Sequence, residues 1–173
     1  MSDKNNTGQI GVRHIASIDG LRAIAVTAVV LYHLGISWIP GGFLGVDLFF
    51  VISGYVITRL ILDSINQSSA LDLRAFYAAR LRRIYPGFIF MVICTIIFIG
   101  VWAPEAIKRF LVDLPYAITG TINWFLVARH QDYFEAIGRP PLLQHTWSLA
   151  VELQFYLIWP IILLAILKYF GKK

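Results

Sequence analysis

Charged residues are scarce in this sequence, and cysteine is almost absent. Only 14% of the 173 residues are charged and 58% are hydrophobic, whereas soluble domains are about 25% charged, so an ordinary soluble domain is excluded. The single cysteine, Cys94, excludes an internal disulfide, and no spacing of cysteine and histidine predicts a metal site. The excess of 15 basic over 10 acidic residues is typical of the cytoplasmic loops of a membrane protein, so we expect no nucleic-acid partner.

Four apolar stretches are long enough to cross a bilayer, which takes about 20 residues of helix. They cover residues 18–39, 43–62, 84–103 and 147–167. A further stretch, residues 110–128, is interrupted by Asp113, Pro115, Gly120 and Asn123, which predicts a re-entrant or short outer-face helix. The predicted fold is all-α, a polytopic transmembrane helix bundle with four spans; the alternative is five spans.

The basic residues predict the orientation in the membrane. Residues 1–17 form a polar lead without a signal-peptide pattern, and residues 18–173 form the membrane domain. Arg74 and three further arginines lie between the second and third spans, and Lys168 follows the last span, so the positive-inside rule places both segments in the cytoplasm. We therefore expect a multi-pass protein of the inner membrane with a cytoplasmic N-terminus and an even number of crossings.

The first span carries three ionisable residues, Asp19, Arg22 and His33. Such groups are expensive at membrane depth and usually face a protein interior or a wet cavity. Eleven residues separate Arg22 from His33, which is three helical turns plus about 20°, so both lie on one face, and Asp19 can pair with Arg22. The alternative is a snorkelling arginine and an interfacial histidine.

Polar residues also interrupt the second and last spans. Asp47 falls near the outer end of the second span, where His33 emerges from the first. Ser53, beside Gly54, is equally typical of close helix packing. At the start of the last span, helical steps of three and four residues place His145, Ser148 and Glu152 on one face. A buried glutamate needs a partner, and His145 or an arginine from another helix could supply it.

A short amphipathic helix before the third span contains Arg80, Arg82 and Arg83. Arginine clusters at this position commonly determine topology or bind anionic lipids. Several guanidinium groups at close spacing also suit a ligand with more than one phosphate. Both interpretations remain open from the residues alone.

Four motifs in this order resemble the membrane acyltransferase 3 family, which includes O-antigen, peptidoglycan and exopolysaccharide O-acetyltransferases. The motifs are DGLRA at 19–23 with His33, GVDLFFVISG at 45–54, RLRRIYP at 80–86 and HTWSLAVELQFY at 145–156. The resemblance covers residues 14–168. The sequence departs from the family in containing about half of its roughly ten helices, and in having Leu153 where a second glutamate is usual.

The resemblance implies a transferase that moves an acyl group, usually acetyl from acetyl-CoA, to a hydroxyl of an envelope carbohydrate. Arg80, Arg82 and Arg83 would hold the CoA phosphates, and Arg22 would guide the thioester end. His33 would act as general base or carry a transient acyl group. Asp47 or Glu152 would orient and stabilise the imidazole, and Ser53 could donate to the oxyanion. His145 and Ser148 would contribute to the substrate site.

Two other functions are kept as alternatives. One is a catalytically incomplete fragment that requires missing C-terminal helices or a second subunit. The other is a small helix-bundle transporter in which His33 and Glu152 relay protons. The expected partners are the lipid bilayer, acetyl-CoA as donor substrate and a carbohydrate acceptor, with no bound cofactor.

Overall fold

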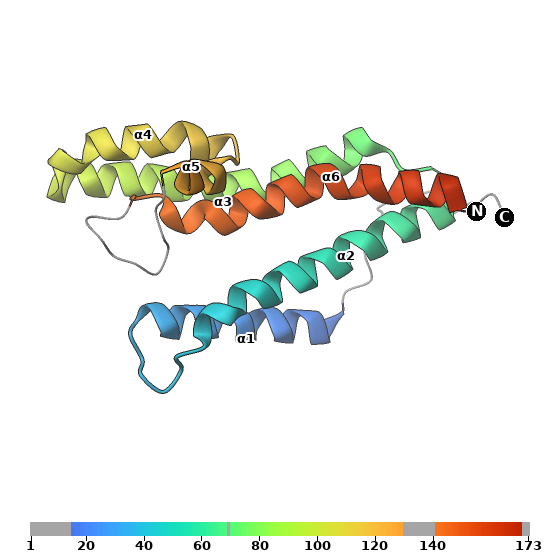
Figure 1. Cartoon of the computed structure of the whole chain (residues 1–173), viewed down its shortest axis with the longest axis horizontal. Helices are drawn as coiled ribbons and strands as arrows, with labels where there is room; N and C mark the ends of the chain where they lie inside the picture. The colour runs from blue at the N-terminus through green and yellow to red at the C-terminus, as the bar shows by residue number, and fades with distance from the viewer. Residues whose placement is uncertain (1–14, 69, 130–140, 171–173) are drawn as a thin grey trace, which may run out of the picture. The chain divides into compact units, whose positions relative to one another are not determined.

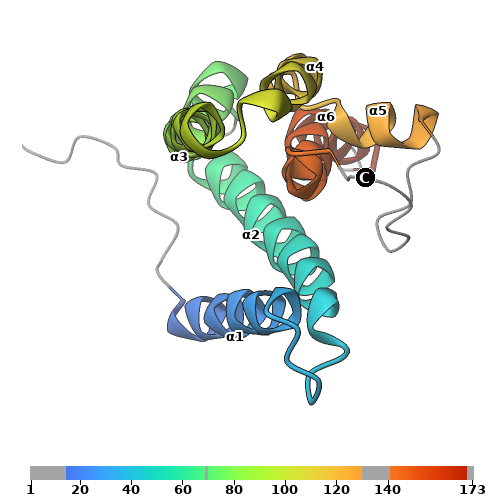
Figure 2. The same cartoon turned by 90° about the vertical axis from the view of Figure 1, so that its left-hand side faces the viewer.

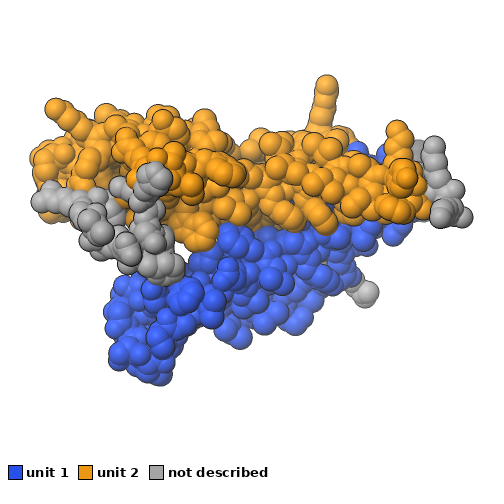
Figure 3. Space-filling model, in the orientation of Figure 1, with its two compact units in different colours: residues 1–71 blue, residues 72–173 orange. Residues whose placement is uncertain are grey.

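The computed structural model describes residues 15–68, 70–129 and 141–170, and within these ranges the chain is helical, with no strand. Two compact units, residues 1–71 and 72–173, divide the chain and are described separately (Figure 3). Most of the predicted polar lead, residues 1–14, lies outside the described residues.

Four of the helices are long and apolar enough to cross a membrane, which confirms the predicted four-span, all-α architecture (Figure 1). They are α1 (Ala16–His33), α2 (Gly45–Ser68, preceded by the 3-10 turn Gly42–Leu44), α3 (Leu73–Trp102) and α6 (Trp147–Phe170, preceded by the 3-10 turn Gln144–Thr146). Two shorter helices, α4 (Ile107–Ile118) and α5 (Ile122–Ala128), stand in the place of the predicted interrupted element.

In the first unit, α1 and α2 pack through glycine. A Cβ atom on Gly45 would lie 2.5 Å from the Ala25 carbonyl oxygen, and one on Gly42 would lie 2.3 Å from the Ala28 carbonyl oxygen. Both distances are shorter than any side chain permits, so the backbones approach as closely as small-residue pairs allow in membrane helices. This contact fixes the register between the end of α1 and the start of α2.

The first span is shorter than the sequence predicts. We expected helix to residue 39, but α1 ends at His33 and Leu34 caps it. Gly35 then adopts a φ of 71°, a left-handed conformation that glycine enters without penalty and that turns the chain. The apolar residues 34–39 therefore belong to the connection, and His33 is the last helical residue of α1.

The basic segment and the third span form one helix, not two. Asp72 caps α3, since its carboxylate accepts hydrogen bonds from the backbone N–H groups of Arg74 and Ala75, at 2.9 and 3.1 Å. From there α3 continues through Pro86 to Trp102, 30 residues or about 45 Å. A bilayer core is only about 30 Å thick, so the arginine-rich first third of α3 can extend beyond it.

In the second unit, α4 turns back along α3. Figures 1 and 2 show α4 antiparallel to α3 and α5 lying across the axes of α3 and α6. The far end of α4 reaches Tyr85, whose hydroxyl donates to the Ile118 carbonyl at 2.9 Å. Tyr85 is 17 residues, about 25 Å of helix, before the end of α3. Because α4 runs along α3 and not across its end, this geometry favours the re-entrant form of the predicted element.

A hydrophobic core joins these helices near the start of α6. Phe110, Ile122 and Leu143 are fully buried there. They pack with Phe88 and Ile99 of α3, so the two short helices and the start of α6 form one packed layer against α3.

Candidate functional site

The structure pairs Asp19 with Arg22 on α1, as predicted. The Arg22 guanidinium lies 3.7 Å from the Asp19 carboxylate, and the Arg22 side chain is only 26% exposed. Because α1 is one unbroken helix from Ala16 to His33, Arg22 and His33 share a face about 16 Å apart along the axis. The helix therefore presents a cation and an imidazole on one stripe.

The ring of His33 is oriented by its own helix. Its Nδ1 lies 2.8 Å from the Val29 carbonyl oxygen. A carbonyl can only accept, so Nδ1 donates in this contact, and in the neutral ring the lone pair then lies on Nε2. Tyr32 packs edge-on against the imidazole at 5.6 Å between ring centroids. This arrangement suits His33 to accept a proton at Nε2.

Asp47 and Ser53 lie on α2. Asp47 is exposed in the first turn of α2, at the same end of the helical pair as His33. Ser53 is buried in the middle of α2, with 6% of its surface exposed. Gly45 packs against Ala25, well before His33 on α1, so the meeting of Asp47 with His33 stays a prediction. The burial of Ser53 agrees with its alternative role in helix packing.

The arginines of α3 fall on two faces. Arg80 is half-buried, with its guanidinium 5.6 Å from the centre of the Phe76 ring, whereas Arg82 and Arg83 are exposed. Residues three apart on a helix are neighbours, so Arg80 and Arg83 can bind the same ligand. Arg82 is turned about 200° from Arg80. The continuous helix thus brings together two of the three predicted phosphate-binding arginines and points the third elsewhere.

The predicted residues of the last span lie at the start of α6. His145 is exposed in the 3-10 turn, and Ser148 and Glu152 are half-buried one helical turn apart. The Tyr156 hydroxyl donates a hydrogen bond to the Glu152 carboxylate. Tyr156 itself is buried, so it holds this carboxylate in one orientation on α6.

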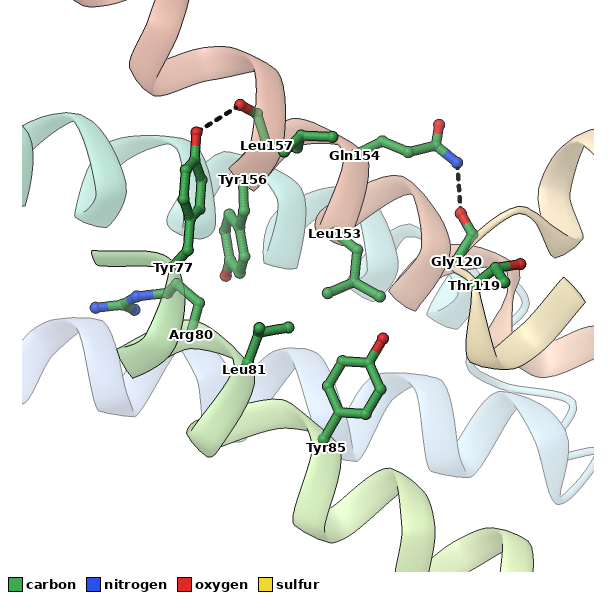
Figure 4. Close-up of a pocket in the computed structure, with 10 residues that line it drawn as sticks. All are labelled: Tyr77, Arg80, Leu81, Tyr85, Thr119, Gly120, Leu153, Gln154, Tyr156 and Leu157. Atoms are coloured by element: carbon green, nitrogen blue, oxygen red, sulfur yellow. Dashed lines mark hydrogen bonds between the residues drawn. The ribbon is translucent and has the colours of Figure 1, made fainter. Parts of the chain in front are cut away.

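A cavity of about 240 Å³ opens between α3, α6 and the turn that joins α4 to α5. Its walls come mainly from apolar and aromatic side chains, and Arg80 is its charged residue (Figure 4). The lining residues are Tyr77, Arg80, Leu81 and Tyr85 of α3, Thr119 and Gly120 of the turn, and Leu153, Gln154, Tyr156 and Leu157 of α6. The cavity is too small to enclose a whole nucleotide cofactor, but it can hold a narrow apolar or amide chain.

Gln154 organises this cavity, and the sequence analysis assigned it no role. Its side-chain N–H groups donate to the Gly120 carbonyl at 2.7 Å and to the Asn123 side-chain oxygen at 2.9 Å. Its oxygen accepts from the Trp124 indole at 3.2 Å. Irregular backbone at membrane depth must find partners within the protein, and Gln154 supplies them. A lone amide inside an apolar span is the sequence feature that could have indicated this role.

Tyr77 and Tyr85 were also missed. The Tyr77 hydroxyl donates to the Leu157 carbonyl of α6 at 3.0 Å, and the Tyr85 hydroxyl holds the end of α4. The two tyrosines therefore tie the basic third of α3 to both other walls of the cavity. Their spacing of eight residues, close to two helical turns, puts them on one face of α3.

Asp113 connects α4 to the segment that precedes α6. It is 4% exposed, and its carboxylate accepts a hydrogen bond from the Leu142 backbone N–H at 3.0 Å. Burial raises the pKa of this carboxyl above its usual value, against the opposing effect of the backbone hydrogen bonds and of Arg129 and Arg109. The contact fixes where α6 begins and so where His145 lies.

No cluster of three potential metal ligands occurs among the described residues. A family model for an acyltransferase domain matches residues 15–173. The peptidoglycan O-acetyltransferase OatA of Listeria monocytogenes is 43% identical over 157 residues, which is 91% of this chain and 25% of the relative. The O-acetyltransferase OatA of Staphylococcus aureus is 40% identical over 161 residues, 93% of this chain and 26% of the relative.

A third relative, the protein YrhL of Bacillus subtilis, is described as a putative peptidoglycan O-acetyltransferase. It is 40% identical over 151 residues, 87% of this chain and 24% of the relative. The chain therefore spans about a quarter of the length of the curated relatives it matches. No solved structure matches the chain.

Proposed function

Because the chain belongs to the acyltransferase domain family, we propose that it carries out O-acetyl transfer from acetyl-CoA to a hydroxyl of an envelope carbohydrate. The residue-level observation that supports the proposal most strongly is the hydrogen bond between His33 Nδ1 and the Val29 carbonyl. It makes Nε2 the basic nitrogen of an imidazole on a candidate membrane-spanning helix, on the same face as the paired Arg22 about 16 Å away.

On the donor side, Arg80 and Arg83 bind the phosphates of acetyl-CoA. The two guanidinium groups lie on one face of α3, in the part of the helix that can extend beyond the bilayer. A guanidinium group binds phosphate through two parallel hydrogen bonds, which favours arginine over lysine for phosphate binding. Arg82 contributes long-range charge from its separate face. The cavity beside Arg80 then receives the arm that carries the acetyl group.

In the transfer step, Nε2 of His33 takes the proton of the acceptor hydroxyl as its oxygen attacks the thioester carbon. The carbon–sulfur bond breaks, the acetyl ester forms, and CoA leaves as thiolate, which takes up the proton. Asp47, which lies in the same unit as His33, is the proposed carboxylate that stabilises the imidazolium formed in between. An acetyl-imidazole intermediate at Nε2 is the other route, because imidazole is itself a nucleophile.

Among envelope carbohydrates, the relatives favour peptidoglycan as the acceptor. Two of them are described as peptidoglycan O-acetyltransferases, one with that assignment marked putative. O-antigen and exopolysaccharide remain acceptors suggested only by the motifs. The basic first third of α3 and Lys168 at the end of α6 support an inner-membrane orientation with these segments and the N-terminus in the cytoplasm.

A second function is favoured by the lengths of the relatives, which are about four times that of this chain. The chain could bind the acyl donor while other helices, in the same or another polypeptide, provide the acceptor site. Under this alternative, acetyl-CoA binds and transfer requires the additional component.

The proposal is tested with membranes that carry the protein and radiolabelled acetyl-CoA. We expect base-labile label on the glycan fraction, and more of it than in membranes that lack the protein. Label that stays wholly with CoA, despite measured acetyl-CoA binding, would favour the second function. The absence of both binding and transfer would contradict the proposed function.

A further inference from the structure

The two ends of the cavity differ in chemistry. Arg80 lies at one end, and Thr119 and Gly120 lie at the other (Figure 4). Between them the wall is formed by tyrosine and leucine side chains, among them Tyr85, Leu81 and Leu153. A ligand with an anionic carrier and a narrow uncharged chain would therefore place its charge at Arg80 and extend the chain along the tyrosine and leucine walls toward Gly120.

At the Gly120 end of the cavity, the Leu153 side chain packs against the backbone of the turn. A Cβ atom on Gly120 would lie 3.1 Å from Leu153 Cδ1 and 3.5 Å from Leu153 Cβ, so the leucine packs directly on the glycine. Gly120 has a φ of 67°, which other residues adopt only with strain. A side chain at position 120 would therefore be strained and would contact Leu153, so we expect this position to require glycine.

The turn is also held in place from two sides. Gln154 donates to the Gly120 carbonyl at 2.7 Å, and Tyr85 donates to the Ile118 carbonyl at 2.9 Å. The Gln154 bond is partly buried, so breaking it leaves the Gly120 carbonyl without this donor, whereas the Tyr85 bond is exposed. The end wall of the cavity is therefore a fixed surface, and chain length at this end is decided by the side chain of residue 153.

We infer that Leu153 limits the length of the acyl group that the protein accepts and so restricts the donor to short acyl-CoA thioesters. This inference rests on the proposed function, because it takes Arg80 as the site of the CoA phosphates. Under this inference a two-carbon acetyl group is accommodated beside Leu153, and a longer acyl chain has to displace the leucine from its packing on Gly120. A methylene that fits or fails to fit an apolar pocket changes binding by about tenfold or more.

The test measures binding of free CoA, acetyl-CoA and butanoyl-CoA to the purified 173-residue chain in lipid nanodiscs. For the wild-type protein we expect butanoyl-CoA to bind about tenfold or more weakly than acetyl-CoA. Leu153→Ala removes three carbons, so the ratio should fall to about threefold or less, while free CoA binds as before. Ile158→Ala, on the exposed side of α6 and outside the cavity, is the matched control and should retain the wild-type ratio.

Leu153→Val, which removes one carbon, provides a second variant if the alanine protein does not fold. It should give a ratio between those of the wild-type and alanine proteins. An unchanged ratio in a folded variant that still binds acetyl-CoA through Arg80 would overturn the inference and leave the proposed function standing. Failure of the wild-type protein to bind any CoA species, or binding unaffected by Arg80→Gln, would overturn both.

Discussion

Replacement of Gln154 by leucine should loosen the second unit more than any other single polar substitution in α6. The change keeps an apolar side chain of similar length and removes the donors to the Gly120 carbonyl and the Asn123 oxygen, at 2.7 and 2.9 Å. It also removes the acceptor for the Trp124 indole at 3.2 Å. The Gly120 carbonyl, the Asn123 side chain and the Trp124 indole then lack their hydrogen bonds to residue 154.

The magnitude follows from the number of bonds. Interhelical hydrogen bonds in membranes average about 0.6 kcal/mol, with a maximum near 1.7 kcal/mol. The three bonds to Asn123 and Trp124 at this average, together with the Gly120 carbonyl left without its donor, which costs about 1–3 kcal/mol, give an expected loss of about 3–5 kcal/mol in the free energy of unfolding. Gln154→Glu should recover part of the loss, because a carboxylate still accepts from Trp124 but cannot donate to Gly120.

The assay is reversible unfolding in mixed micelles, followed by tryptophan fluorescence, in which Trp124 should also report its changed environment. Gln67→Leu, an exposed glutamine near the end of α2, is the control and should change stability by less than about 0.5 kcal/mol. A Gln154→Leu protein as stable as this control would refute the argument that the amide holds the turn.

Three further changes test other parts of the structure. Gly45→Val should destabilise the first unit by about 1–3 kcal/mol in thermal unfolding, because a Cβ there meets the Ala25 carbonyl at 2.5 Å; an unchanged melting temperature would contradict the close packing. Burial raises the pKa of Asp113, so the protonated carboxyl contributes stability below the unfolded pKa of about 3.9, and this contribution is lost as pH rises through the folded pKa. Asp113→Asn should flatten the dependence of the melting temperature on pH. The same dependence in wild-type and variant proteins would contradict a raised pKa at Asp113. In titration calorimetry, Arg83→Gln should weaken CoA binding by about tenfold or more and Arg82→Gln by much less, since only Arg83 shares the helix face of Arg80. Equal losses of affinity in the two variants would contradict the placement of Arg82 on a different face.

The features that the sequence predicted correctly are those that depend on local periodicity. Four spans and the pairing of Asp19 with Arg22 follow from apolar length and from spacing along one helix. The face shared by Ser148 and Glu152 has the same origin. These properties need no knowledge of what another helix contributes.

The features that sequence analysis missed depend on contacts between distant segments. Nothing local shows that Gln154 reaches Gly120, 34 residues earlier, or that Tyr85 reaches Ile118. The end of α1 was placed too late because residues 34–39 remain apolar although Gly35 turns the chain. The continuity of α3 was missed because the change from basic to apolar composition suggested a boundary that the backbone does not have.

The central claim is that the imidazole of His33 performs the acyl transfer. It is tested most directly by the single-turnover rate of acetyl transfer from labelled acetyl-CoA, compared between the wild-type protein and His33→Ala at equal membrane abundance and equal CoA affinity. We expect a rate lower by about 10²–10⁴-fold in His33→Ala, the usual contribution of general acid–base catalysis. An undiminished rate in His33→Ala would contradict it.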